Sequence, residues 1–124
     1  MKNKLLLTLG VCWLFLGLAT AQEPIPLKAG GGVWKSTDGG VTFKAVFDKH
    51  TQPIGAVAVD PKNPDQVVWA GTGEVWTRNS VSVGDGIYRS DDGGQNWIKM
   101  GLEKSERISS IRIDPNDPNT LYVG

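Results

Sequence analysis

Residues 71–86, "GTGEVWTRNSVSVGDG", bring together side-chain types from which a ligand-binding site could be built. Carboxylates, hydrogen-bond donors and a flat aromatic ring are supplied by Glu74, Trp76, Arg78, Asn79 and Asp85. An aromatic ring packs against the CH face of a sugar, and charged and amide groups bind the sugar hydroxyls. This mixture indicates a carbohydrate-binding groove.

A structural interpretation of the same residues stays open. Arg78 could pair with Glu74 or Asp85, and Trp76 could pack against a neighbouring structural unit, because buried aromatics are commonly packing residues. His50 is the only histidine, and the chain offers no Ser or Cys partner suited to a nucleophile–base relay with it. We therefore expect His50 to be solvated rather than catalytic.

The first 21 residues have the pattern of a secretory signal peptide. A basic "MKNK" precedes the apolar run "LLLTLGVCWLFLGL", and "ATA" at 19–21 supplies the small residues of a cleavage site. A membrane anchor needs about 20 apolar residues, and this run is shorter. We therefore predict cleavage after Ala21, a secreted or periplasmic mature chain without a membrane span, and a linker over residues 22–30.

Cleavage at this point limits the chemistry of the mature chain. Cys12 is the single cysteine and lies in the signal segment, so disulfides, thiol catalysis and cysteine–metal sites are excluded. Loss of Lys2 and Lys4 leaves a small excess of acidic residues and no basic stripe, which argues against a nucleic-acid partner. No residue pattern indicates a cofactor.

A long segment of the chain is written twice. "GVWKSTDGGVTF" at 32–43 returns 54 residues later as "GIYRSDDGGQNW" at 86–97. The likeness continues without a gap from "IGAVAVDPKNPDQVVWA" (54–70) to "ISSIRIDPNDPNTLYVG" (108–124). Tandem repeats of about this period are typical of β-propeller blades with four strands each. The repeat therefore predicts a modular architecture.

Each repeat has the pattern of four short strands. β-prone runs flank a Ser-x-Asp-Gly-Gly turn, and strong turn residues between such runs indicate a hairpin. "IGAVAVD" (54–60) is almost entirely apolar, as expected of a strand covered on both faces. Pro, Asn and Asp turns separate it from a return strand. Because no segment after the signal has helical periodicity, we expect an all-β fold.

The Ser-x-Asp-Gly-Gly turns are interpreted as architectural. Ser and Asp side chains can bond the backbone amides of the turn, glycines provide positive φ, and a following aromatic packs beneath it. The turns offer too few ligands for calcium, so no metal is expected. The residues given this structural role are Ser36, Asp38, Gly40, Phe43, Ser90, Asp92, Gly94 and Trp97.

The turn, the "DPxxP" motif and the "WAGTGE" and "YVG" runs follow one another in fixed order. In this the chain resembles secreted Asp-box β-propellers, a group that includes sortilin-type receptor domains and xyloglucanase-like glycoside hydrolases. The resemblance implies a partial propeller over residues 31–124, with repeat units 32–85 and 86–124. Propellers close with about 4–8 blades. About two four-stranded blades leave an incomplete ring, so we expect a fragment whose parent protein supplies the remaining blades.

Successive antiparallel strands connect at alternate ends of a blade, and this sorts the connections into two groups. The Pro turns and the Ser-x-Asp-Gly-Gly turns fall at one end. Residues 47–53, 71–86 and 101–107 fall at the other end, where the resemblance implies that propellers bind their ligands.

One function implied by the resemblance is glycoside hydrolysis. Such enzymes place two carboxylates across the scissile bond, and Glu74 and Asp85 are the catalytic candidates here. "VGDGIYRS" (83–90) keeps the Gly-x-Tyr-Arg part of the hydrolase pattern, but Val83 occupies the position of its catalytic aspartate. Because the second carboxylate would come from another blade, we expect this chain alone to be inactive.

A sortilin-like propeller that binds a peptide or glycan without turning it over is the alternative. Both functions use Trp76, Arg78 and Asn79 as ligand-binding residues, and both imply a polysaccharide or peptide ligand for the parent protein. A purely structural role on the cell surface is the third hypothesis.

Overall fold

The computed structural model describes residues 31–50, 53–76 and 79–124, so the predicted signal peptide and linker lie outside the described residues. Every regular element in these ranges is a strand. In chain order they are β1 (Trp34–Lys35), β2 (Lys44–Ala45), β3 (Ile54–Val59), β4 (Val68–Thr72), β5 (Ile87–Ser90), β6 (Ile98–Gly101), β7 (Ile111–Ile113) and β8 (Leu121–Val123). Each repeat unit contributes four of these strands, as predicted.

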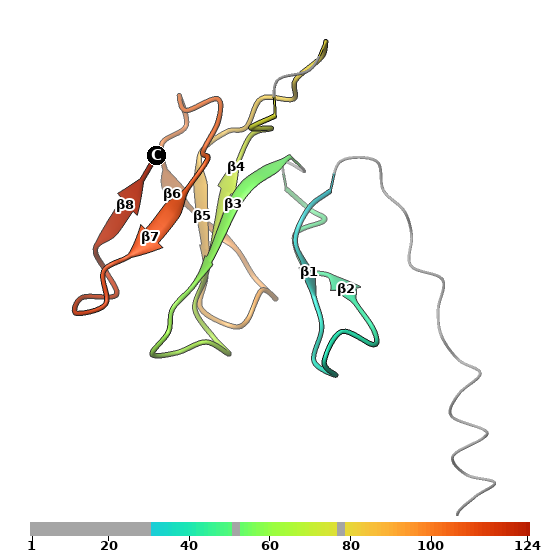
Figure 1. The fold of residues 1–124 in the computed structure, drawn as a ribbon, viewed down its shortest axis with the longest axis vertical. Helices are drawn as coiled ribbons and strands as arrows, with labels where there is room; N and C mark the ends of the chain where they lie inside the picture. Colours follow the sequence, from blue (N-terminus) through green and yellow to red (C-terminus); the bar gives the residue numbers. More distant parts are fainter. Residues whose placement is uncertain (1–30, 51–52, 77–78) are drawn as a thin grey trace, which may run out of the picture.

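A four-stranded antiparallel sheet, in the order β3-β4-β5-β6, stands between two hairpins (Figure 1). The β1–β2 hairpin lies on one side of it and the β7–β8 hairpin on the other. The prediction of an all-β propeller fragment with an incomplete ring is confirmed, because the described strands form one whole blade and two half-blades. Each repeat supplies the last two strands of one blade and the first two of the next.

The two repeats differ by one residue in the turn that follows their long strand. Val59 pairs with Val68 across β3 and β4, whereas Ile113 pairs with Leu121 across β7 and β8. The first members of these pairs are 54 residues apart in the sequence, but the second members are 53 apart. The prediction of a gapless repeat is therefore wrong beyond this turn.

Two apolar clusters join the hairpins to the central sheet. The buried members of the cluster beside β1–β2 are Phe47, Ala70 and Tyr88, and those of the cluster beside β7–β8 are Trp69, Ile87 and Ile108. Neighbours on one strand belong to different clusters, because successive strand residues point to opposite faces. The central sheet is thus packed on both faces by its own alternating residues.

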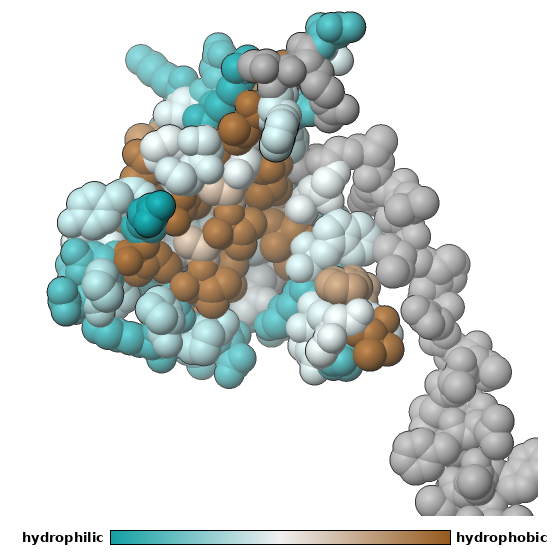
Figure 2. All heavy atoms as spheres, viewed as in Figure 1, coloured by the Kyte–Doolittle hydropathy of each residue, from teal (hydrophilic) through white to brown (hydrophobic). Residues whose placement is uncertain are grey.

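The coverage of β3 is less complete than its apolar sequence predicts. Ala56 and Ala58 pack on the β7–β8 side, but Val57 and Val59 on the opposite face are 48% and 46% exposed. Figure 2 shows apolar side chains gathered between the two hairpins, on the face of the molecule where β3 lies. The β1–β2 hairpin covers the later strands of the sheet and leaves this part of β3 open.

The two Ser-x-Asp-Gly-Gly turns have the same hydrogen bonds. Oγ of Ser36 accepts from the N–H of Gly40 at 2.8 Å, and Oγ of Ser90 accepts from the N–H of Gly94 at the same distance. Each serine hydroxyl also donates to the aspartate of its own turn at 2.8 Å. Within the described ranges, no three His, Cys, Asp or Glu side chains gather in a way that could hold a metal ion.

The aspartates of these turns are held in the charged form. The side chain and backbone of Thr42 donate to Asp38 and lower its pKa from 3.8 to about 2. The backbone and then the side chain of Asn96 do the same for Asp92, whose pKa also falls to about 2. Hydrogen bonds to a carboxylate favour its ionised state, so both turns depend on charged aspartates.

The aromatic residues after the turns differ in their surroundings. Trp97 is half-buried, and its Nε1–H donates to the carbonyl oxygens of Val46 and Gly94 at 2.7 and 3.0 Å. The equivalent Phe43 is 48% exposed. The second turn is therefore tied to the β1–β2 hairpin, whereas no described hairpin packs on Phe43 in the corresponding way.

Candidate functional site

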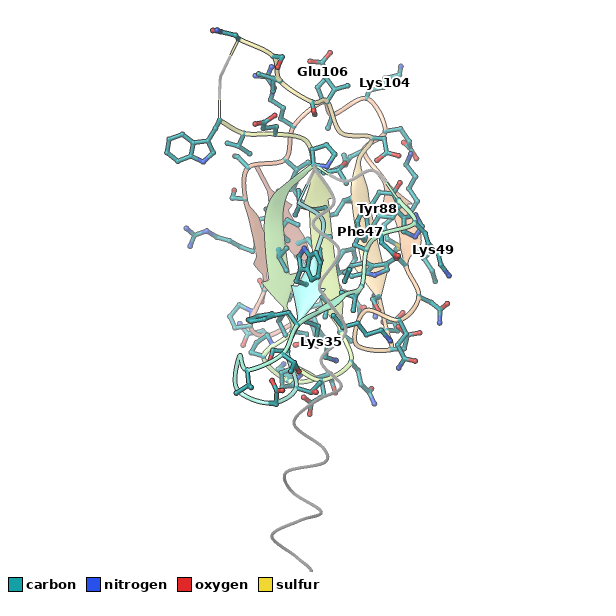
Figure 3. The ribbon with its side chains drawn as sticks, turned by 90° about the vertical axis from the view of Figure 1, so that its right-hand side faces the viewer. Lys35, Phe47, Lys49, Tyr88, Lys104 and Glu106 are labelled. Carbon is teal, nitrogen blue, oxygen red and sulfur yellow. The ribbon has the colours of Figure 1, made fainter. Side chains whose placement is uncertain are left out.

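Three connections meet at the end of the central sheet opposite the Ser-x-Asp-Gly-Gly turns. The N–H of Gly73 donates to the carbonyl of Pro53 at 2.8 Å, and the N–H of Gly84 donates to the carbonyl of Glu106 at 2.8 Å. These bonds join residues of 47–53, 71–86 and 101–107. Figure 3 shows Lys104 and Glu106 at this end and Lys35 toward the other. We call the joined connections the loop end.

Glycines allow the backbones at the loop end to approach one another. A Cβ on Gly73, whose φ is +104°, would lie 2.2 Å from the carbonyl oxygen of Glu106. A Cβ on Gly84 would lie 2.4 Å from the carbonyl carbon of Thr72. Real Cβ atoms do not approach so closely, so the "GTGE" and "VGDG" glycines are packing requirements of this end.

Thr72 fastens the two ends of the 71–86 connection. Its side chain is fully buried, and its Oγ1 accepts from the N–H of Asp85 at 2.8 Å and from the N–H of Gly86 at 3.1 Å. The hydroxyl donates to the carbonyl of Gly86 at 2.7 Å. The hydroxyl thus uses both its donor and its acceptor capacity. Sequence reasoning passed over Thr72, because a threonine at a strand end gives no separate signal.

Asp85 is directed toward the later strands of the sheet. Its Oδ2 accepts from the hydroxyl of Tyr88 on β5 at 2.7 Å and from Nζ of Lys99 on β6 at 3.1 Å. Nζ of Lys99 also lies 5.9 Å from the centre of the Tyr88 ring. This carboxylate therefore has a structural role that accounts for its position, and the partner predicted for it, Arg78, lies outside the described residues.

Glu74 lies in a different environment. Its N–H donates to the carbonyl of Ser82 at 2.9 Å, and its Oε2 accepts from the N–H of Ser82 at 3.2 Å. Glu74, Asn79, Ser80 and Ser82 line a polar surface hollow. Asp85 does not line this hollow, so the structure does not bring the two catalytic candidates into one cavity.

Trp76 extends from the loop end into solvent. Its side chain is 83% exposed. The structural interpretation, in which this ring packs against a neighbouring unit, is therefore wrong for the described residues. An exposed indole beside a hollow lined by carboxylate, amide and hydroxyl groups can stack on a flat apolar ligand face while polar groups bind its hydroxyls.

His50 belongs to an aromatic cluster that sequence reasoning missed. Its ring centre lies 4.9 Å from that of Phe47 and 5.2 Å from that of Tyr88, and the residue is half-buried. The expectation of a solvated histidine is wrong to this extent. Figure 3 shows Phe47 and Tyr88 directed toward each other between the hairpin and the central sheet. A packing role explains His50 without catalysis.

Comparisons with known proteins give two curated relatives. The chain is 28% identical over 96 residues to a protein named "Xyloglucanase" from Paenibacillus sp, which covers 75% of this chain and 9% of the relative. It is 32% identical over 97 residues to "Oligoxyloglucan-reducing end-specific xyloglucanase" from Emericella nidulans, which covers 76% of this chain and 11% of the relative. The chain thus spans about a tenth of the length of these proteins.

No family model matches the sequence, and no solved structure matches it significantly. None of the described residues belongs to a helix long and apolar enough to cross a membrane. Over three quarters of its length, the chain is similar to part of two xyloglucanases.

Proposed function

We propose that this chain is part of a secreted, glycoside hydrolase-like β-propeller and that its loop end binds a polysaccharide of the xyloglucan type. The observation that carries the proposal is the exposed ring of Trp76 beside the hollow of Glu74, Asn79, Ser80 and Ser82. The similarity to two proteins named as xyloglucanases supports this class of ligand. Residues 1–21 serve as the export signal in this proposal.

The Ser-x-Asp-Gly-Gly turns act as Asp-boxes in this proposal. Their matching hydrogen bonds and the lowered pKa of Asp38 and Asp92 are explained by turn stability alone. The turns hold the ends of the strands on the side away from the loop end. Polysaccharide recognition is therefore assigned to the loop end and architecture to the turns.

Each side chain at the loop end has a distinct part in binding. Trp76 stacks on the CH face of a sugar ring, since aromatic faces pack well on apolar surfaces. Glu74 and Asn79 bind sugar hydroxyls through their oxygen and amide groups. Arg78 joins them as a donor, as its place in the sequence between Trp76 and Asn79 suggests.

Hydrolysis needs a second carboxylate that this end of the described chain does not supply. Inverting glycosidases place the two carboxylates about 6.5–9.5 Å apart across the bond. Asp85 is occupied by Tyr88 and Lys99 and does not line the hollow of Glu74. We assign binding to this chain, and we assign any hydrolysis to a ring in which another blade adds the second carboxylate.

A non-catalytic, sortilin-like propeller that binds a peptide or glycan is the second candidate. It is favoured by one observation, the engagement of Asp85 in an ion pair with Lys99 and a hydrogen bond from Tyr88. In that case Glu74 is a binding residue only. The two candidates differ in what Glu74 does after the ligand is bound.

Retention on immobilised xyloglucan tests the proposal. The Trp76→Ala variant should bind at least tenfold more weakly than the wild-type chain, because it removes the stacking surface. Val41→Ala is the matched control, since Val41 is 75% exposed on the first turn, away from the loop end. Equal retention of all three proteins, or no retention of the wild type, would refute the assignment of the loop end.

A further inference from the structure

The two hairpins that flank the central sheet are complementary halves of one blade. β1 and β2 occupy the same place in their repeat as β5 and β6, the last two strands of the central blade. β7 and β8 occupy the same place as β3 and β4, the first two strands. The chain therefore carries both halves of a second blade, but the central sheet holds them apart.

The first half of this divided blade is missing from the surface of β3. Val57 and Val59 are the repeat equivalents of Ile111 and Ile113. The two isoleucines pack into the cluster around Trp69, whereas the two valines are 48% and 46% exposed. The valines therefore present a socket of the kind that is filled, elsewhere in the same chain, by the first two strands of a neighbouring blade.

The outer face of β7–β8 offers a group of the kind that fills such a socket. With the one-residue shift in the Pro turn, Tyr122 corresponds to Trp69. Trp69 is 4% exposed in the cluster with Ile111 and Ile113, but Tyr122 is 61% exposed. An aromatic knob and an aliphatic socket of matching position thus lie open at opposite sides of one molecule.

The strand edges match as well. In the central blade, Trp69 on β4 lies opposite Arg89 on β5, whose guanidinium carbon is 5.3 Å from the centre of the Trp69 ring. The equivalents are Tyr122 on β8 and Lys35 on β1. A β8 strand placed beside β1 in this register would again set a cation against an aromatic ring.

We propose that the β7–β8 hairpin of one copy of this chain completes a blade with the β1–β2 hairpin of a second copy. β8 adds to the edge of β1, and Tyr122 of one copy enters the Val57–Val59 socket of the other. Exposed sheet edges are templates for such pairing. The contact joins different surfaces on the two copies, so it extends from copy to copy until a ring closes. Rings of about 4–8 blades correspond to two to four copies.

Sedimentation velocity of the full chain across a range of micromolar concentrations tests this contact. The wild type should form assemblies of two to four copies. Tyr122→Asp, which blocks the knob, and Val57→Asp/Val59→Asp, which blocks the socket, should each sediment as a monomer. Val41→Asp, an equally polar change at a 75% exposed valine outside the contact, should assemble as the wild type does.

A mixture of the two blocked variants provides the sharpest test. The Tyr122→Asp chain keeps a working socket and the Val57→Asp/Val59→Asp chain keeps a working knob, so an equimolar mixture should form a dimer and stop there. Far-ultraviolet circular dichroism shows whether each variant keeps the strand content of the wild type. A monomeric wild type, an assembly that tolerates either block, or a mixture of folded variants that stays monomeric would overturn the proposal.

Discussion

The hydroxyl of Tyr88 donates a 2.7 Å hydrogen bond to Oδ2 of Asp85, and the same oxygen lies 3.1 Å from Nζ of Lys99. Through this contact a carboxylate of the 71–86 connection is fixed to β5 and β6. The relationship decides how Asp85 should be interpreted, because a carboxylate that anchors a loop has effects on stability that a catalytic carboxylate need not have.

Replacement of Asp85 should separate these roles. Asp85→Ala removes the acceptor of the Tyr88 hydroxyl and should lower the free energy of unfolding by about 1–3 kcal/mol. Asp85→Asn keeps an acceptor and loses mainly a partly exposed ion pair, which is worth about 0–1 kcal/mol. Urea denaturation measures both. In a Tyr88→Phe background the cost of Asp85→Ala should shrink, and an unchanged cost would contradict the anchoring role.

The aspartates of the two turns predict how stability depends on pH. Asp38 and Asp92 have a pKa of about 2 in the folded chain against an ordinary value of 3.8. The folded state therefore binds protons less readily, so the stabilisation is present above about pH 4 and is lost as the pH falls from 3.8 toward 2. The urea midpoint should decline over this window.

Asn substitutions provide the control for this pH dependence. Asp92→Asn should lower the urea midpoint at pH 6, and the gap from the wild type should narrow near pH 2, where the wild-type carboxylate is also protonated. Asp38→Asn should have the smaller effect, because the glycines of its turn are exposed while Gly93 and Gly94 are buried. A gap that stays constant from pH 6 to pH 2 would count against charged aspartates in the turns.

Glycine substitutions should show how closely the loop end is packed. Gly84→Ala places a Cβ 2.4 Å from the backbone of Thr72 and should cost about 3 kcal/mol. Gly39→Ala is the matched control: its φ is +72°, but no atom lies within 4 Å of the added Cβ, so only about 1 kcal/mol of backbone strain is expected. Thermal denaturation would measure both, and equal losses would contradict the close approach.

The indole of Trp97 should contribute through its hydrogen bonds as well as its packing. Trp97→Phe removes the bonds to the carbonyls of Val46 and Gly94 and should cost about 1 kcal/mol. Trp34→Phe is the comparison, because its Nε1–H donates to Gly31 in an exposed position and its loss should cost less. A larger loss at Trp34 would show that the link between the hairpin and the second turn has little weight.

Much of the fold follows from local chemistry that is legible in the sequence. The Ser-x-Asp-Gly-Gly turns could be predicted, because a serine, an aspartate and two glycines satisfy the turn within five residues. The central blade followed from the repeat of these turns. The extra residue between Val59 and Val68 could not be found by a gapless alignment, because the aligned prolines mask the change in pairing.

The loop end was harder to predict because its contacts are distant in sequence. The three connections were assigned to one end from strand order alone, and the structure brings them together. The partner of Asp85 is Lys99, across two strands, and nothing in the spacing of 14 residues indicates that pair. The exposure of Trp76 likewise depends on which blades surround it, and a sequence pattern does not report that.

Hydrogen exchange measured by mass spectrometry, with and without a xyloglucan oligosaccharide, tests most directly whether the loop end is the binding site. The account predicts slower exchange in peptides from 71–86 and 101–107 and unchanged exchange in the turns at 36–43 and 90–97. Protection of the turns instead, or no change anywhere at saturating oligosaccharide, would contradict it.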